Sequence, residues 1–223
     1  MTQLDAWIEN LNKTVFLEWK SKYPSWKTGF KIFYGPVTKN PQLMIMSHNP
    51  GGGEYYFQTE DLQRFENGDF STPKTNSYLI RKNRMAKRMQ DLFSGKKKIL
   101  EESVTFPILF FRSKDLGTWN NVPKKKRFEM EQFCYSKVKE IFDQIKPKKI
   151  LILGFGTEHK LKKHFFKELS SEKILSNSKN RKLAYEYHWK RIPTFCMIHP
   201  TGNRISNEDW IKIKQKFYQF LVN

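Results

Sequence analysis

The chain has 223 residues, of which 38% are hydrophobic and 15% aromatic; this suits a single domain spanning 1–223 and is too apolar for a disordered protein. No apolar run approaches the roughly 20 residues that cross a bilayer, so we expect no membrane-spanning segment. Because 41 lysines and arginines stand against 22 acidic residues, the formal net charge is +19 and the pI about 9.8. Such a balance favours a polyanionic partner.

The first half of the chain alternates between helix and strand patterns. An amphipathic pattern predicts a helix over 4–20, and the apolar run 43–46 predicts a buried strand that stops at Pro50 and three glycines. A helix that Asn76 can cap is expected over 76–93, and a second buried strand over 104–111.

The second half continues the alternation. Its clearest strand pattern lies at 149–153, where an apolar run ends at a Gly-Phe-Gly sequence. The other expected elements are helices ending near residue 145 and spanning 157–169 and 207–221, a strand over 194–198, and an edge strand or hairpin at 183–189.

Strands separated by helices imply right-handed crossovers. We therefore predict a three-layer α/β/α sandwich around a central, mostly parallel four-stranded sheet. Ligands of such sheets bind at the carboxyl ends of the strands. Three polar loops follow predicted strands directly, at 47–54, 112–123 and 199–207. We expect the functional site there.

The two cysteines, Cys134 and Cys196, lie far apart inside apolar segments. They are expected to be reduced core thiols rather than a disulfide or a metal pair, and their number excludes a four-cysteine iron–sulfur site. The N-terminal stretch lacks the features of a secretion signal. These observations favour a cytoplasmic protein.

Basic residues gather in short runs at 81–88, 96–98, 124–127 and 160–163. On nucleic acid such runs replace condensed counterions and make binding steeply salt-dependent. A solvated face is the plainer alternative for any one run. An anionic membrane is a weaker competitor, because no lipidation motif or strongly amphipathic anchor accompanies the charge.

Two of the polar loops carry residue types suited to catalysis. The loop that begins at Ser47 contains His48, Asn49 and three glycines, which permit positive φ and close approach of a ligand to the backbone. It lacks the spacing of a P-loop, and by itself a plain tight turn explains it equally well. The last loop places His199 beside Pro200 at a strand end, where a histidine can also be merely structural.

Together and in this order, the loops resemble those of the uracil-DNA glycosylase superfamily, above all its single-strand-selective monofunctional branch. That branch has a Gly-x-Asn-Pro-Gly motif after the first strand and a His-Pro-Ser-Pro-type motif after the last. The counterparts here are 47–51 and 199–202, and 107–110 followed by Asn121 and Pro123 is a third likeness. The resemblance covers about residues 31–212.

The resemblance implies a monofunctional DNA glycosylase that hydrolyses the N-glycosidic bond of a flipped-out base without metal or cofactor. His199 would donate a hydrogen bond to the base carbonyl as negative charge accumulates there, assisted by backbone amides of the loop 49–52. Asn49 would orient the attacking water, since an amide is no useful base. The implied partner is single- or double-stranded DNA containing a modified base, with no membrane and no obligate protein partner.

The remaining site residues follow from the same resemblance. Rings just past the first motif could stack on the flipped base, with core packing as the alternative. The loop after His199 would enter the gap that the flipped nucleotide leaves. The predicted base pocket is Ser47, His48, Gly51, Gly52, Tyr56, Phe57 and Val104; the predicted DNA contacts are Thr201, Asn203, Arg204, Ile205 and Asn121.

Two departures from the branch bear on the substrate. Where related enzymes read uracil with an asparagine near the start of the central strand, this chain has Ser103 and Val104, and valine can neither donate nor accept. Three consecutive glycines also open space. The hypothesis is therefore a bulky pyrimidine, such as hydroxymethylated or glucosylated cytosine of phage DNA, removed in antiviral defence.

Other functions stay open at this stage. One is a base-excision repair glycosylase for uracil or 5-hydroxymethyluracil, and another is a catalytically silent DNA-binding protein. A nuclease is disfavoured because no carboxylates cluster with metal-binding spacing, although Glu54 and Asp115 could approach each other in the fold.

Overall fold

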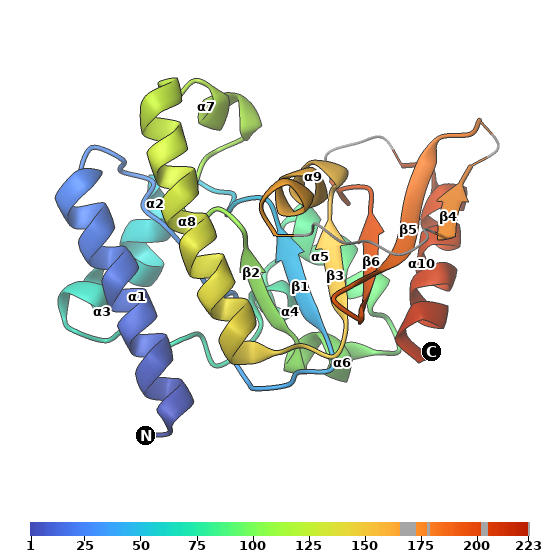
Figure 1. Ribbon diagram of the computed structural model, residues 1–223, viewed down its shortest axis with the longest axis horizontal. Helices are drawn as coiled ribbons and strands as arrows, with labels where there is room; N and C mark the ends of the chain where they lie inside the picture. The colour runs from blue at the N-terminus through green and yellow to red at the C-terminus, as the bar shows by residue number, and fades with distance from the viewer. Residues whose placement is uncertain (166–172, 178, 202–204, 223) are drawn as a thin grey trace.

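The computed structural model describes residues 1–165, 173–177, 179–201 and 205–222. Its centre is a six-stranded sheet in the order β2-β1-β3-β6-β5-β4 (Figure 1). The strands are β1 (Met44–Ser47), β2 (Val104–Pro107), β3 (Ile150–Leu153), β4 (Lys173–Ser176), β5 (Lys182–Trp189) and β6 (Ile192–Met197).

The prediction of a mostly parallel sheet is confirmed, but the predicted number of strands is wrong. Strands β2, β1, β3 and β6 are parallel neighbours, and they form the expected four-stranded core. Two more strands extend it, since β5 pairs antiparallel with β6 and β4 antiparallel with β5. The β5–β6 turn uses Lys190 and Arg191 at positive φ, so the hairpin lacks the Asn-Gly or Asp-Gly signal that marks such turns in a sequence.

Helices cover both faces of this sheet. Their bounds are α1 (Gln3–Lys22), α2 (Glu54–Phe57), a π-helical turn η1 (Gln58–Leu62), α3 (Gln63–Glu66), α4 (Ser77–Ile80), α5 (Arg84–Leu92), α6 (Lys97–Glu102), α7 (Leu116–Asn120), α8 (Lys124–Ile145), α9 (Phe155–His164) and α10 (Asn207–Val222).

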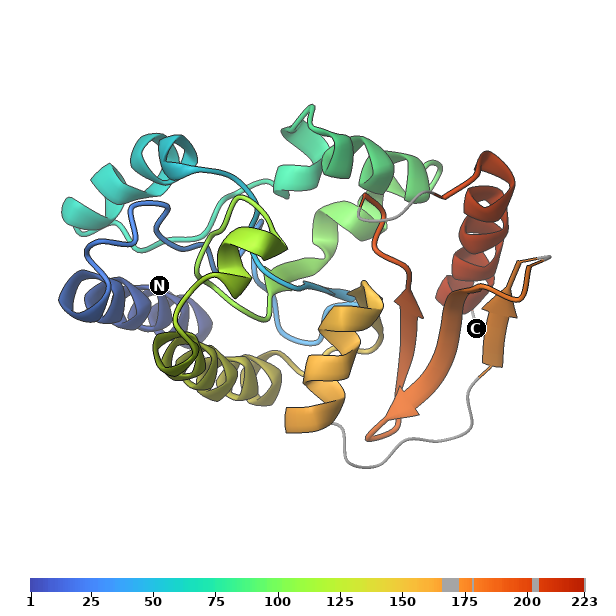
Figure 2. The ribbon, with the colours of Figure 1, turned by 90° about the horizontal axis from the view of Figure 1, so that it is seen from above.

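Alternating strand residues divide the core into two layers. Met44 and Met46 of β1 pack in one apolar cluster with α1, α8 and α9, while Leu43 and Ile45 pack in a second with α4, α5, α6 and α10. Figure 2 shows the same division from above, with α8 and α9 on one side of the strands and α5 and α10 on the other. The chain therefore forms the predicted α/β/α sandwich.

The helix predicted over 76–93 is two helices. Asn76 caps α4 as expected, accepting from the Tyr78 N–H, but a second cap follows at Asn83, which accepts from the Ala86 N–H. An asparagine side chain that satisfies a helix N-terminus competes with continuation of the helix before it, and here the chain is extended at Arg81.

The second predicted strand, 104–111, is also shorter than expected. β2 ends at Pro107, and the chain then leaves the sheet to form an isolated antiparallel bridge between Phe111 and Phe30. The apolar residues 108–111 are nevertheless buried. Burial alone explains the apolar run, which is why the sequence overestimates the strand.

Two further expectations concern the cysteines and membrane-spanning helices. Cys134 and Cys196 are buried free thiols, as predicted. Burial raises the pKa of Cys134 to about 12, so its thiol is inert at neutral pH. Over the described part of the chain, no helix combines the length and apolarity needed to cross a bilayer.

The parallel strands bring the three polar loops to one edge. Ser47 pairs with Pro107 at the carboxyl ends of β1 and β2, and Leu153 pairs with Met197 at those of β3 and β6. The loop after β2 also contacts the loop after β1, because the Ser113 N–H donates to the Pro50 carbonyl at 3.2 Å. The predicted loops therefore leave the sheet at the same edge.

Candidate active site

His199 lies just beyond the carboxyl end of β6 and is partly buried. Its Nδ1 accepts a hydrogen bond from the Thr201 backbone N–H at 3.3 Å, and the Thr201 hydroxyl lies at the same distance. A backbone N–H can only donate, so Nδ1 carries the lone pair. Burial lowers the pKa of His199. The imidazole is therefore neutral at pH 7, with its proton on Nε2 as a hydrogen-bond donor.

Gly154, directly after β3, leaves space for the His199 side chain. A Cβ on Gly154 would lie 3.3 Å from the His199 Cβ, and Gly154 has φ +98°, a region that side chains rarely adopt. Its N–H donates to the Met197 carbonyl at 2.8 Å. Both backbone conformation and space require glycine here, beside the catalytic candidate.

Gly154→Ala should destabilise the protein by about 1–3 kcal/mol through backbone strain, besides pushing on His199. Gly156→Ala is the matched control, because a Cβ there meets nothing within 4 Å and lies in α9, where alanine is favoured. Chemical denaturation of both variants checks this. Equal stability of the two would show that Gly154 is not required for its conformation.

Asn49 is held by a neighbouring loop. Its Nδ2 donates to the Ser113 Oγ at 2.5 Å, and that hydroxyl donates onward to the Asp115 carbonyl at 2.9 Å. Ser113 is 1% exposed, so the hydrogen-bonded chain starts from a fixed point. The amide nitrogen is thereby turned toward Ser113 and the carbonyl oxygen away from it. The sequence singled out Asn49 but gave no signal for Ser113.

The glycine loop lies on a buried ion cluster. Arg112, 1% exposed, donates through Nη1 to the Gly51 carbonyl at 3.1 Å and through Nη2 to Asp61 at 3.3 Å. Lys31 donates to the same carboxylate at 2.8 Å. Burial lowers the pKa of Lys31, an effect that the contact with Asp61 opposes. The cluster ties the loop to the core through its backbone, which spacing along the sequence could not reveal.

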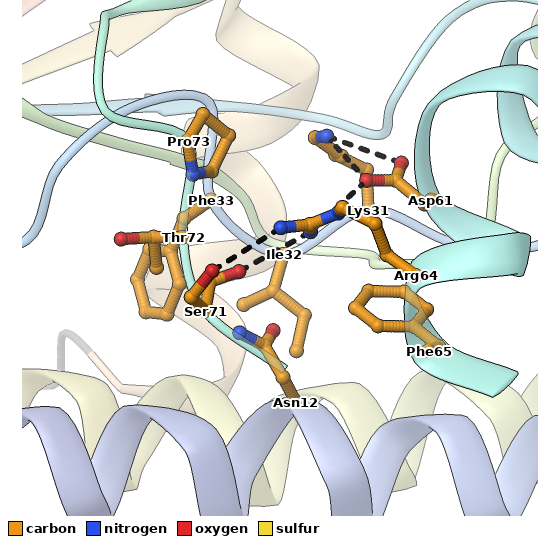
Figure 3. A pocket seen from close by; sticks show the side chains of 10 residues that line it. All are labelled: Asn12, Lys31, Ile32, Phe33, Asp61, Arg64, Phe65, Ser71, Thr72 and Pro73. Carbon is orange, nitrogen blue, oxygen red and sulfur yellow. Dashed lines mark hydrogen bonds and ion pairs between the residues drawn. The ribbon is translucent and has the colours of Figure 1, made fainter. Parts of the chain in front are cut away.

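Asp61 enters this cluster from the π-helical turn η1, a wider turn often found at functional sites. Figure 3 shows Lys31 and Arg64 pointing toward Asp61, with Arg64 also reaching Ser71. The cavity beside them has a volume of about 10 Å³, room for roughly one water molecule. That cavity is too small for a nucleobase and serves the packing of the cluster.

The three glycines differ in the space they leave. A Cβ at Gly51 or Gly53 would meet nothing within 4 Å, whereas at Gly52, φ +103°, it would lie 2.8 Å from the Tyr56 ring. Tyr56 is 38% exposed and carries the Arg81 guanidinium 5.2 Å from its ring centroid. The predicted open space is therefore confined to the outer two glycines, and Tyr56 covers the middle one.

His48 faces a different neighbourhood from Ser47. Ser47 is buried with its hydroxyl beside the phenols of Tyr34 and Tyr78. The His48 pKa is lowered to about 4 by burial and by the positive charge of Lys160, and it also responds to His199. Side chains that follow one another on a strand point to opposite faces. His48 follows the last residue of β1, and its electrostatic interaction with His199 indicates that the two imidazoles are neighbours, while Ser47 points into the tyrosine layer.

The depressed His48 pKa predicts an acid-sensitive fold. Unfolded histidine takes up a proton near pH 6.5 and folded His48 only near pH 4, so stability is complete above pH 6.5 and is lost as pH falls toward 4. Between these pH values the protonation of His48 should lower the free energy of unfolding by about 1.4 kcal/mol per pH unit, and His48→Gln should abolish this contribution. Denaturation curves at pH 7 and pH 5 measure it; an unchanged difference between these values in His48→Gln would contradict it.

Lys160 and Glu131 complete this neighbourhood. The Lys160 Nζ donates to Glu131 Oε1 at 2.8 Å, and the Trp119 indole N–H donates to the same oxygen at 3.3 Å. Lys160 lies on α9 and Glu131 on α8, so the pair joins two helices beside His48. The sequence showed Lys160 only as part of a basic run.

Besides Ser47, which points into the tyrosine layer, two more residues of the predicted base pocket lie away from the site. Phe57 is fully buried, and its ring packs on Trp19 and Phe30 in the core. Val104 is the first residue of β2 and pairs with Met44 at the amino ends of the strands, opposite the loops. The resemblance placed Val104 in the base pocket through the start of this strand, whereas the end of the strand near the loops is Pro107.

The residues predicted to contact DNA fall into three groups: some lie outside the described residues, some contact other parts of the protein, and one is exposed. Asn203 and Arg204 lie outside the described residues. Thr201 contacts His199, and Ile205 is partly buried against the core cluster of α5 and α10, which disfavours it as a free wedge. Asn121 is exposed at the end of α7, with its N–H bonded to the Gly117 carbonyl.

The carboxylates considered for a nuclease serve as structural partners. Glu54 accepts from Gln58, and Asp115 caps α7 by accepting from the Thr118 N–H. Over the described residues, no group of three or more histidine, cysteine or acidic side chains converges in a way that could hold a metal ion.

The fold and loops together define an α/β protein with a polar site at the carboxyl edge of its parallel strands, where Asn49, His48 and His199 lie on loops after β1 and β6. Searches against models of known protein families and against curated protein sequences find no match to this chain.

Proposed function

We propose that the protein is a monofunctional DNA glycosylase, which hydrolyses the N-glycosidic bond of a flipped-out modified pyrimidine and leaves an abasic site. The observation that carries the proposal is the state of His199, a neutral imidazole whose Nδ1 accepts from Thr201 so that Nε2–H is the donor. Its loop shares the sheet edge with the loop of Asn49. The order of these motifs resembles the uracil-DNA glycosylase superfamily, which is the second support.

In the proposed reaction the bond between the sugar C1′ and the base nitrogen breaks, and its electron pair leaves with the base. Negative charge accumulates on the base carbonyl oxygen, where the His199 Nε2–H donates a hydrogen bond. Water adds its oxygen to C1′, and its proton leaves to solvent or to the departing base. The protein supplies electrostatic stabilisation and position, and no covalent intermediate is involved.

Asn49 supplies position for the water. Because Nδ2 is committed to Ser113, the carbonyl oxygen Oδ1 is the atom available to accept from a water molecule. An amide cannot take up a proton at neutral pH, so orientation is its contribution. The fixed Ser113 keeps the amide from rotating its nitrogen toward that water.

For the base we propose a bulky pyrimidine, such as hydroxymethylated or glucosylated cytosine of phage DNA, removed in antiviral defence in the cytoplasm. The open space at Gly51 and Gly53 supports room for a substituent. At the end of β2 beside Ser47 stand Pro107 and the buried Ile108, which offer no side-chain amide to select plain uracil. Base-excision repair of uracil or 5-hydroxymethyluracil is the alternative substrate assignment.

The first turn of α8 is a candidate DNA contact. Its four residues 124–127 are all cationic and none is acidic, which opposes the helix dipole. Lys124 and Lys125 are exposed, whereas Arg127 donates to the Asn120 carbonyl. Figure 1 shows this turn next to α7, above the sheet. DNA phosphates would reduce the repulsion between these cations and the positive end of the α8 dipole.

Replacing Lys124 and Lys125 by alanine should weaken binding of single-stranded DNA and lower the slope of log affinity against log salt by about 1.4. The same double variant should be more stable by about 0.3–1 kcal/mol, because two cations leave a helix N-terminus. Lys139→Ala is the control, on the same helix in an exposed pair with Asp143. Anisotropy titrations at several salt concentrations measure the slope; an unchanged slope would remove this turn from the interface.

The activity itself is tested on oligonucleotides that carry uracil, 5-hydroxymethyluracil, hydroxymethylcytosine or its glucosylated form. The protein is incubated with each in EDTA, and alkali then cleaves any abasic site. Strand cleavage that depends on both Asn49 and His199 would support the glycosylase, and the preferred base would separate defence from repair. DNA binding without cleavage of any oligonucleotide would favour the catalytically silent alternative.

A further inference from the structure

His48 is fixed at the site by its backbone. Its carbonyl accepts from the Leu109 N–H at 2.9 Å, just after the Ser47 carbonyl accepts from the Ile108 N–H at 2.8 Å. Two consecutive bonds to the segment after β2 leave the main chain little freedom. The direction of the His48 side chain is therefore set by the sheet edge rather than by a mobile loop.

The His48 imidazole has no hydrogen-bond partner anywhere in the part of the chain that the structure describes. It is partly buried, and the titratable groups it responds to are Lys160 on α9, Glu131 on α8 and His199. Lys160 and Glu131 are committed to each other. Both imidazole nitrogens of His48 are therefore free to pair with a ligand, which would replace the water that they lose when the ligand binds.

The segment after β2 supplies no polar side chain near His48 that could pair with the polar edge of a base. The segment that follows this strand, 108–111, is apolar and buried. Pyrimidines present both donors and acceptors on their polar edge, and a pocket must pair with them to discriminate between bases. A neutral imidazole has one nitrogen that donates and one that accepts. His48 therefore has the chemistry that the β2 segment lacks.

We propose that His48 is the specificity-determining residue, which hydrogen-bonds the polar edge of the flipped pyrimidine while His199 holds the carbonyl that gains charge. The proposal rests on the proposed glycosylase function, since it assigns a role within the same site. His48 acts on recognition of the base, and it takes no part in bond breakage. Losing it should change the ranking of bases rather than the chemistry.

The test is binding, measured in an Asn49→Ala background that suppresses cleavage. Anisotropy gives the affinity for oligonucleotides carrying uracil, 5-hydroxymethyluracil, hydroxymethylcytosine or its glucosylated form, each divided by the affinity for a matched oligonucleotide with a tetrahydrofuran abasic site. Adding His48→Ala should reduce the ratio for the preferred base by about tenfold, the effect of one lost hydrogen bond. Affinity for the abasic oligonucleotide should stay the same.

Two further variants keep the result interpretable. His48→Gln retains a donor and an acceptor and should restore a preference among the bases, in a changed order. His159→Ala removes an exposed histidine of α9 and should leave all ratios unchanged. Equal ratios with and without His48, or no preference of the parent for any base over the abasic site, would overturn the proposal. Failure of the proposed function is distinct, because it shows as wild-type protein that forms no alkali-labile site.

Discussion

His199→Ala should lower the single-turnover rate of base release by about 10²–10³-fold, the range for loss of one fixed donor to a developing oxyanion. The reason is specific to the neutral tautomer, whose Nε2–H is presented to the site because Nδ1 accepts from Thr201. The Thr201 hydroxyl also lies 3.3 Å from this Nδ1. DNA affinity should change little, since the cationic turn that we propose as a phosphate contact lies elsewhere, at the start of α8.

The control for this prediction is His159→Ala, which removes an exposed histidine of the same protein. His199→Gln is the informative second variant, because its amide N–H can partly replace the imidazole donor and should recover some of the rate. Rates are measured with enzyme in excess, so that product release does not contribute. If His199→Ala released base within about threefold of the wild-type rate, His199 would not be the donor.

Asp61→Asn should destabilise the protein by about 3–5 kcal/mol, the cost of removing one partner from a buried ion pair. Asp61 is 2% exposed and is the shared partner of Lys31 and Arg112. Without its charge, two buried cations repel each other, and Arg112 keeps its contact with Glu60 at 3.7 Å. The thermal midpoint should fall by roughly 10 °C.

Asp143→Asn is the matched control for Asp61→Asn, because Asp143 pairs with Lys139 on the exposed face of α8. Its loss should cost about 0.5 kcal/mol or less. Both variants are compared by denaturant titration at one pH. A cost for Asp61→Asn as small as that of Asp143→Asn would show that the cluster contributes nothing beyond a surface pair, and the support it gives Gly51 would have to come from elsewhere.

Local patterns in the sequence were sufficient to predict the layered α/β/α fold. Every residue of β1 and β3 is buried, which gives each strand an apolar run. One face of α8 is buried, which gives the helix an amphipathic pattern. Such patterns of burial can be seen in a sequence. β5 lies where the sequence predicted an edge strand or hairpin, at 183–189, but β4 was not predicted. The hairpin between β5 and β6 turns at Lys190 and Arg191, two residues that carry no common turn signal.

The sequence predicted only part of the candidate site, for a different reason. Asn49 and His199 follow strands directly, so their common edge is a consequence of parallel topology. The contacts that hold the loops depend on pairs remote in sequence, such as Asn49 with Ser113 and Gly51 with Arg112. Val104 was misplaced because the resemblance was aligned to the start of a strand whose site-facing end is Pro107.

The most direct test of a glycosylase that uses Asn49 and His199 is identification of the free base. Glucosylated hydroxymethylcytosine in an oligonucleotide is incubated with the protein in EDTA, and the small-molecule fraction is analysed by mass spectrometry beside the uracil and 5-hydroxymethyluracil oligonucleotides. We expect an intact free base from at least one of them, in equal amount to abasic sites, with neither product from Asn49→Ala or His199→Ala. Release of a nucleotide or nucleoside instead, or of base at an unchanged rate from both variants, would contradict a glycosylase built on these two residues.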